Sequence, residues 1–245
     1  MRRYLFAGGM VAAIALFSAL GVWQVERLAW KTDLIARVNA RVHAPAAAAP
    51  GPGIAISQAN DEYRHVTVHG QFLNGDEAQV YTLSELGAGY WVMTPLRRDD
   101  GSVVYINRGF VPEDRRDPAT RPAPSGEVTV TGLLRLPETH GWLFSQANDP
   151  AHDAWYHRDV AAMAASRHLG AIAPYFVDAD TTPNPGGWPR GGLTVVKFPN
   201  SHLVYAITWF SLAAMLIGLL VWLKAEWGAD ERSGGQTSEA SERGM

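Results

Sequence analysis

Two long uncharged apolar runs lie at opposite ends of this 245-residue chain, and they constrain its fold more than any other feature. The first run covers residues 4–23 and the second covers residues 203–223. Because a helix rises about 1.5 Å per residue, each run spans roughly 30 Å, which is the thickness of the hydrocarbon core of a bilayer. We predict one transmembrane helix at each end, with a central domain at 54–200 between them.

The first run also resembles a secretory signal peptide, because Arg2 and Arg3 precede it. The apolar region of a signal peptide is usually about 7–15 residues long and ends at small residues. This run is longer and ends at Val22-Trp23-Gln24, which favours an uncleaved anchor. Apolar residues continue at spacings of three and four, so we expect the helix to extend to about residue 42, before the Pro/Ala/Gly-rich residues 45–53.

Two spans place both termini on the same side of the membrane. Lys and Arg are about twice as frequent in residues 1–3 and 224–245 as between the spans, which favours cytoplasmic termini. In a bacterium the protein would then lie in the inner membrane, in contact with lipid, with the central domain in the periplasm. The Ser/Glu/Gly-rich residues 229–245 are predicted to be a disordered tail.

The central domain has the pattern of a β structure. Alternating apolar residues predict strands at 63–72, 79–83, 90–96, 103–111, 127–136, 175–177 and 193–198. An Asp-Asp-Gly-Ser turn at 99–102 predicts a hairpin, and a helix is expected at 160–169 with Asp159 as its N-cap. The fold class is therefore a membrane protein with a mainly antiparallel sheet or small barrel and one or two short helices.

Several classes of function are disfavoured by composition and motif. The net charge of -3 gives no sign of a nucleic-acid partner, and the absence of cysteine excludes disulfides and thiolate sites. Known phosphate-loop, nucleophile-elbow and zinc-protease motifs do not occur, so an enzyme is not expected. His65 and His69 share a strand face, but four residues apart they are separated by roughly 13 Å, too far to bind one ion.

The start of the second span combines polar and aromatic side chains. His202, Tyr205 and Trp209 are spaced to share one helix face, and a histidine at the membrane entrance is costly unless it is satisfied or used. A neutral imidazole is also an axial ligand of haem iron. Near the outer end of the first span, Trp23, Gln24 and Arg27 would lie at the same height. These residues are either interfacial anchors or part of a binding site.

An ordered set of motifs resembles the surfeit locus protein 1 family over about residues 4–225. The motifs are Gly21-x-Trp23-Gln24-x-x-Arg27-x-x-Trp30-Lys31, Tyr63-Arg64, Gly70-x-Phe72, Gly89-Tyr90, Thr94-Pro95, Asn107-Arg108-Gly109-Phe110-Val111 and Pro199-Asn200-Ser201-His202-Leu203-x-Tyr205-Ala206-x-Thr208-Trp209-Phe210. At Ser201 the family often has Asn or another polar residue, while the histidine is retained.

The resemblance implies an assembly factor for haem-copper cytochrome c oxidase that binds haem a and assists its insertion into subunit I. The family's proposed haem ligand corresponds to His202. We expect Tyr205 and Trp209 to flank the haem, Arg27 to face a propionate, and Trp23 and Gln24 to lie nearby. Arg108, Gly109 and Phe110 would then face a partner, subunit I or haem a synthase. A scaffold for subunit I that binds no haem is the alternative, and a haem-dependent redox enzyme is a second one.

Overall fold

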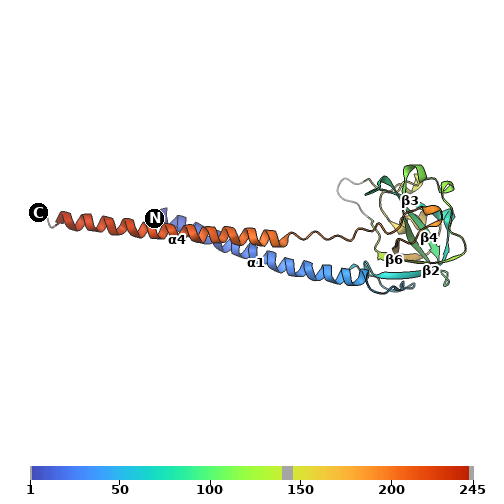
Figure 1. Cartoon of the computed structure of the whole chain (residues 1–245), viewed down its shortest axis with the longest axis horizontal. Coiled ribbons are helices and arrows are strands. Elements are labelled where there is room, and N and C mark those ends of the chain that lie inside the picture. Colours follow the sequence, from blue (N-terminus) through green and yellow to red (C-terminus); the bar gives the residue numbers. More distant parts are fainter. Residues whose placement is uncertain (1, 140–145, 243–245) are drawn as a thin grey trace. The chain divides into compact units, whose positions relative to one another are not determined.

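The computed structural model describes residues 2–139 and 146–242 of the chain. The chain divides into two compact units (Figure 1). One unit consists of Met1–Ala36 with Lys197–Met245, and the other of Arg37–Val196.

Two long helices make up most of the first unit. Helix α1 covers Arg2–Val42, which confirms that it continues past its apolar run to residue 42. Helix α4 begins at His202, three residues after Pro199, and runs to Glu242. The helices are antiparallel. Arg3, at the start of α1, contacts Trp227 of α4, whereas Phe17, further along α1, contacts Trp209, which comes earlier in α4.

Close packing of α1 on α4 depends on small residues. Ala206 and Ala213 are buried on α4, and Gly21 is buried on α1. A Cβ atom at Gly21 would lie only 2.7–2.9 Å from ring atoms of Phe210. Small residues at such positions are typical of membrane helix pairs, whose association depends on packing rather than on the hydrophobic effect.

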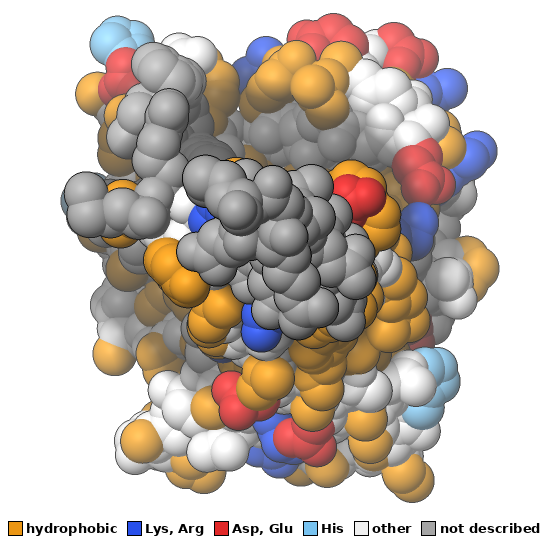
Figure 2. All heavy atoms as spheres, turned by 90° about the vertical axis from the view of Figure 1, so that its left-hand side faces the viewer, with side chains coloured by type: hydrophobic (Ala, Val, Ile, Leu, Met, Phe, Trp, Pro, Cys, Tyr) orange, Lys and Arg blue, Asp and Glu red, His pale blue; other side chains and the backbone are white. Residues whose placement is uncertain are grey.

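Most of the large apolar side chains on both helices are exposed, for example Leu16, Val204 and Trp222. Figure 2 shows hydrophobic side chains open at the surface of the molecule. Within the described residues, the segments Arg3–Val42 and His202–Gly228 are long and apolar enough to cross a membrane. Lipid, and not protein, therefore covers these side chains in a membrane protein with two spans.

The segment predicted to be a disordered tail, residues 229–245, follows the second apolar run. Helix α4 extends into this segment as far as Glu242. Composition favoured disorder because the segment is polar and contains Gly and Ser. Extending an existing helix avoids the cost of nucleation, so a polar segment can continue a helix that it would not start.

The second unit is built on seven strands. They are β1 (Ala47–Ala48), β2 (His65–Phe72), β3 (Ala78–Ser84), β4 (Gly87–Arg97), β5 (Val103–Pro112), β6 (Glu127–Arg135) and β7 (Ile172–Ala179). Their order is β1-β2-β6-β7-β5-β4-β3, and β2 also pairs with β4. This extra pairing closes β2, β6, β7, β5 and β4 into a small barrel. Only β1–β2 and β5–β7 are parallel, so the prediction of a mainly antiparallel sheet or barrel is confirmed.

Short helices connect the strands. Helix α2 covers Gln58–Asp61 and helix α3 covers Val160–Ser166, with 3-10 turns at Asn74–Asp76, Glu113–Arg115, Pro118–Thr120, Pro150–His152 and Pro185–Gly187. Asp159 caps α3 as predicted, by accepting a hydrogen bond from the Ala162 amide, but α3 ends at Ser166 instead of residue 169. The predicted strand at 193–198 is wrong, because the structure has no strand at these residues.

Strands β5 and β7 are buried on both faces. Val104 and Ile106 belong to one core cluster, while Tyr105 between them belongs to a second cluster with Trp155 and Met163 of α3. The first cluster fills the barrel and the second lies between the barrel wall and α3. Burial of both faces explains why residues 103–111 read as a nearly continuous apolar run.

Candidate functional site

The first candidate site lies where α4 begins, against the middle of α1. His202 Nδ1 lies 2.8 Å from Gln24 Oε1, and Gln24 is buried. An amide oxygen only accepts hydrogen bonds, so Nδ1 donates and carries the imidazole proton. The lone pair of the neutral ring is then on Nε2. The structure thus brings together two of the predicted site residues, and Nε2 is the ring nitrogen of His202 that could act as a ligand.

Trp209 contacts α1 one heptad further along the same helix–helix interface. Its ring stacks on Phe17 with 5.6 Å between centroids and 28° between planes. Phe17 precedes Gln24 by seven residues, just as Trp209 follows His202 by seven, so the two contacts repeat along one face of each helix. Trp209 therefore packs between the helices and supports the position of His202, whereas Tyr205 is 52% exposed.

Several cationic and aromatic residues near the outer end of the first apolar run lie on the open surface of α1. Trp23 and Arg27 are both exposed. The Arg27 guanidinium lies 4.4 Å from the centroid of the Trp30 ring, and the Lys31 ammonium lies 5.5 Å from that of Phe198. These cation–π pairs are typical of an interfacial belt. They also place a guanidinium, which suits a carboxylate, on the helix that carries Gln24.

This arrangement suits a metal that brings most of its own ligands. Among the described residues, no group of three or more His, Cys, Asp or Glu side chains is placed to hold a bare metal ion. One imidazole is available at His202, and Tyr205 and Trp23 expose aromatic rings on the same two helices. A macrocycle such as haem supplies its own ring nitrogens and needs only an axial protein ligand and apolar contacts, which this donor set provides.

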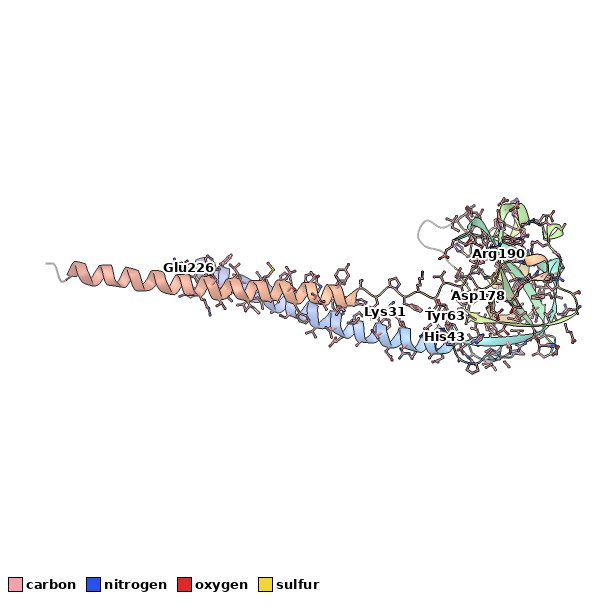
Figure 3. All side chains as sticks on the ribbon, in the orientation of Figure 1. Lys31, His43, Tyr63, Asp178, Arg190 and Glu226 are labelled. Atoms are coloured by element: carbon pink, nitrogen blue, oxygen red, sulfur yellow. The ribbon has the colours of Figure 1, made fainter. Side chains whose placement is uncertain are left out.

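The predicted partner surface at Arg108, Gly109 and Phe110 is wrong, because the structure buries all three residues in the barrel unit. Phe110 exchanges two backbone hydrogen bonds of 2.9 Å with Arg190, whose position is labelled in Figure 3. Gly109 has φ of +124°, and a Cβ there would lie 2.0 Å from Arg190 O. This motif therefore packs the segment around residue 190 against β5.

Sequence reasoning missed a buried charge network around Asp178, a residue of β7 that is labelled in Figure 3. The carboxylate is 3% exposed and accepts hydrogen bonds from Asn107 (2.8 Å), Thr194 (2.9 Å), Arg135 (3.0 Å) and Arg158 (3.3 Å). These residues come from β5, β6, β7 and two loops, so no local spacing could have indicated the network. Because the Asp178 carboxylate already accepts hydrogen bonds from four side chains, its role is structural, and it holds the barrel together.

These features define a class, namely a two-span membrane protein in which apolar helices flank a small β-barrel domain and a supported histidine begins the second span. The model of the SURF1 family matches residues 11–214, a range that includes both Gln24 and His202, and the chain belongs to this family.

Relatives of this family are similar over most of their length. Surfeit locus protein 1 of Rattus norvegicus is 37% identical over 213 residues, covering 80% of this chain and 68% of the relative. The protein of the same name from Homo sapiens is 37% identical over 214 residues, covering 80% and 69%. A SURF1-like protein of Monosiga brevicollis is 37% identical over 231 residues, covering 88% and 85%.

Proposed function

We propose that this protein is an assembly factor for haem-copper cytochrome c oxidase, which binds haem a and assists its insertion into subunit I. Membership of the SURF1 family supports the role in oxidase assembly. The observation that carries the haem-binding step is the hydrogen bond between His202 Nδ1 and Gln24 Oε1, because it leaves Nε2 as the ligating nitrogen.

Each residue of the site has a separate task. His202 ligates the iron, and Gln24 fixes the tautomer and the orientation of its ring. Tyr205 and Trp23 offer exposed aromatic surface to the macrocycle, and Trp209 holds α4 against Phe17. Haem a, as cargo, supplies an iron with an open axial position. A single protein ligand suits a protein that must pass its cargo on.

Arg27 is the cation proposed to pair with a haem propionate. Its guanidinium now stacks on Trp30, and a planar guanidinium can stack on a ring while its N–H groups bind a carboxylate at its edge. The Trp30 contact therefore orients Arg27 and does not compete with the propionate. We expect an Arg27→Lys variant to weaken haem retention, since a lysine lacks the planar fork.

The haem-binding step is tested by purifying the protein from a host that makes haem a. The wild type is expected to show a Soret band, and His202→Ala to lose it and to impair oxidase assembly. His152→Ala is the matched control, because the His152 side chain is 82% exposed and lies in the other unit. A wild type without the band, together with normal assembly in His202→Ala, would reject the haem-binding proposal in favour of a scaffold for subunit I. Turnover with simple electron donors would instead indicate a haem-dependent redox enzyme.

We also propose a location in a bacterial inner membrane, with both termini cytoplasmic and the barrel periplasmic. The excess of Lys and Arg in the tails supports this orientation. A periplasm-active reporter fused after Gly228 should then be silent, while the same reporter inserted in the exposed turn at Gly101 should be active. The reverse pattern would overturn the orientation. Subunit I and haem a synthase are the proposed partners on the periplasmic side.

A further inference from the structure

A cavity of about 430 Å³ opens on the barrel unit, separate from the helical site. Strands β2, β5, β6 and β7 and the loops around residues 124 and 183 contribute to its lining. We propose that this cavity binds a small molecule that carries one carboxylate on an apolar body.

The cavity contains a cation that is largely removed from water. The Arg108 side chain is only 4% exposed and lines the cavity. Its Nε and Nη2 atoms donate to Asn184 Oδ1 at 3.2 and 3.1 Å. Its Nη1 atom lies 3.9 Å from Glu77 Oε2, which is beyond hydrogen-bonding distance. Arg108 thus keeps N–H donors for an additional acceptor.

The buried charges around Arg108 do not balance. Arg121 is also buried and forms the close pair with Glu77, with 2.7 Å between Nη2 and Oε1. Two guanidinium groups therefore share one carboxylate, which leaves one excess positive charge. Burial lowers the pKa of Arg108 to about 10, and Glu77 offsets this only in part. A buried charge without a full partner is costly, and a bound anion would supply that partner.

The apolar part of the lining favours an apolar body on that anion. Phe72, Ile106, Val128 and Val130 line the cavity, and the Phe72 ring lies 5.3 Å from the Arg108 guanidinium. A cavity of this size that combines apolar side chains with a few charged and polar groups has the usual composition of a small-molecule site. A guanidinium binds a planar carboxylate through two parallel hydrogen bonds, which selects a carboxylate as the anion.

One acidic residue, Asp180, also lines the cavity. Its carboxylate accepts a hydrogen bond from the Thr182 amide at 2.8 Å. A nearby negative charge opposes anion binding, so the proposal predicts that Asp180→Asn tightens binding. An asparagine retains the oxygen that accepts from Thr182, so this variant changes the charge and keeps the turn.

The test uses the full chain in lipid nanodiscs with three probes, 4-phenylbutyrate, 4-phenylbutanol and acetate, followed by calorimetry and ligand-observed NMR. The butyrate should bind most tightly, since only it combines the charge with the apolar body. Arg108→Gln should weaken butyrate binding by about 10-fold or more, because it removes a charged hydrogen-bonding partner. Asp180→Asn should strengthen it.

Blocking the cavity provides a variant that leaves Arg108 intact. Ser125 is an exposed lining residue, so Ser125→Trp should abolish butyrate binding, while Ala151→Trp, at an exposed position outside the lining, should not. Thermal unfolding of each variant checks that it is folded. If Arg108→Gln does not fold, the results for Ser125→Trp and Asp180→Asn decide the outcome. Equal binding of the butyrate and the butanol, an unchanged affinity in Asp180→Asn, or binding that survives Ser125→Trp would overturn the proposal.

Discussion

Asp178 of the barrel unit and His202 of the helical unit are polar residues that are used in opposite ways. In the barrel, Asp178 accepts hydrogen bonds from four side chains, so its carboxylate has little capacity left for a ligand. On the helices, His202 has its Nδ1 bonded to Gln24, and among the described residues the structure shows no partner at its Nε2. Saturated polar groups stabilise a fold, whereas a polar group supported on one side and open on the other is suited to binding.

The strongest test of this contrast is removal of the saturated carboxylate. Asp178→Ala leaves Arg135 and Arg158 buried without their shared partner, so we expect a loss of about 3–5 kcal/mol in the free energy of unfolding of the barrel. Urea unfolding followed by tryptophan fluorescence measures this loss. The matched control is Asp99→Ala, whose carboxylate is exposed and pairs with the exposed His69, and it should change stability by less than about 0.5 kcal/mol. Similar losses in both variants would remove the distinction drawn for Asp178.

A smaller effect is expected for a single member of the same network. Thr194→Val removes the hydroxyl that donates to Asp178 at 2.9 Å and retains the shape of the side chain. Because the acceptor is charged and keeps its other donors, we expect a loss of about 1.5 kcal/mol. The double variant Asp178→Ala/Thr194→Val should lose less than the sum of the single variants, since both changes break one contact. Additive losses would show that Thr194 acts independently of Asp178.

Local sequence patterns predicted the elements of this protein better than their long-range contacts. The long uncharged runs indicated the helices and the β-rich run at 103–111 indicated β5, because each pattern arises within a single element. Closure of the barrel depends on β2 pairing with β4 and on β7 lying between β5 and β6, and no local pattern encodes these neighbours.

The same distinction applies to the sites. Gln24 and His202 were expected to be neighbours because both flank a span on the same side, and the 2.8 Å contact confirms this. Arg108 was expected, with Gly109 and Phe110, to face a partner protein. Its burial depends on Glu77 and Asn184, which are far from it in the sequence.

The helical side of the comparison is tested by Gln24→Leu. Loss of one interhelical hydrogen bond should reduce the stability of the helix pair by only about 0.6 kcal/mol, because membrane helices find other partners. The larger consequence is for His202, whose ring should lose its single tautomer. Nitrogen-15 NMR of labelled histidine should show protonated Nδ1 in the wild type and a mixture of tautomers in Gln24→Leu. Gln24→Glu retains an acceptor and should restore protonated Nδ1, whereas a wild-type spectrum in Gln24→Leu would exclude Gln24 as the group that sets the tautomer.

The smallest expected effect concerns Glu138, whose carboxylate is partly exposed and pairs with Arg158. Burial alone would raise the pKa of Glu138, but the hydrogen bonds and the charge of Arg158 outweigh burial and lower the pKa below its usual 4.5. A carboxylate with a lowered pKa in the folded state adds stability above pH 4.5, and this contribution is lost as the pH falls through the folded-state value.

The stability difference between the wild type and Glu138→Gln should therefore be greatest near neutral pH and should shrink in acid. Glu127→Gln, at an exposed position on β6, should show a smaller difference at neutral pH. A difference for Glu138→Gln that does not change with pH would mean that packing, and not the ion pair with Arg158, accounts for its effect.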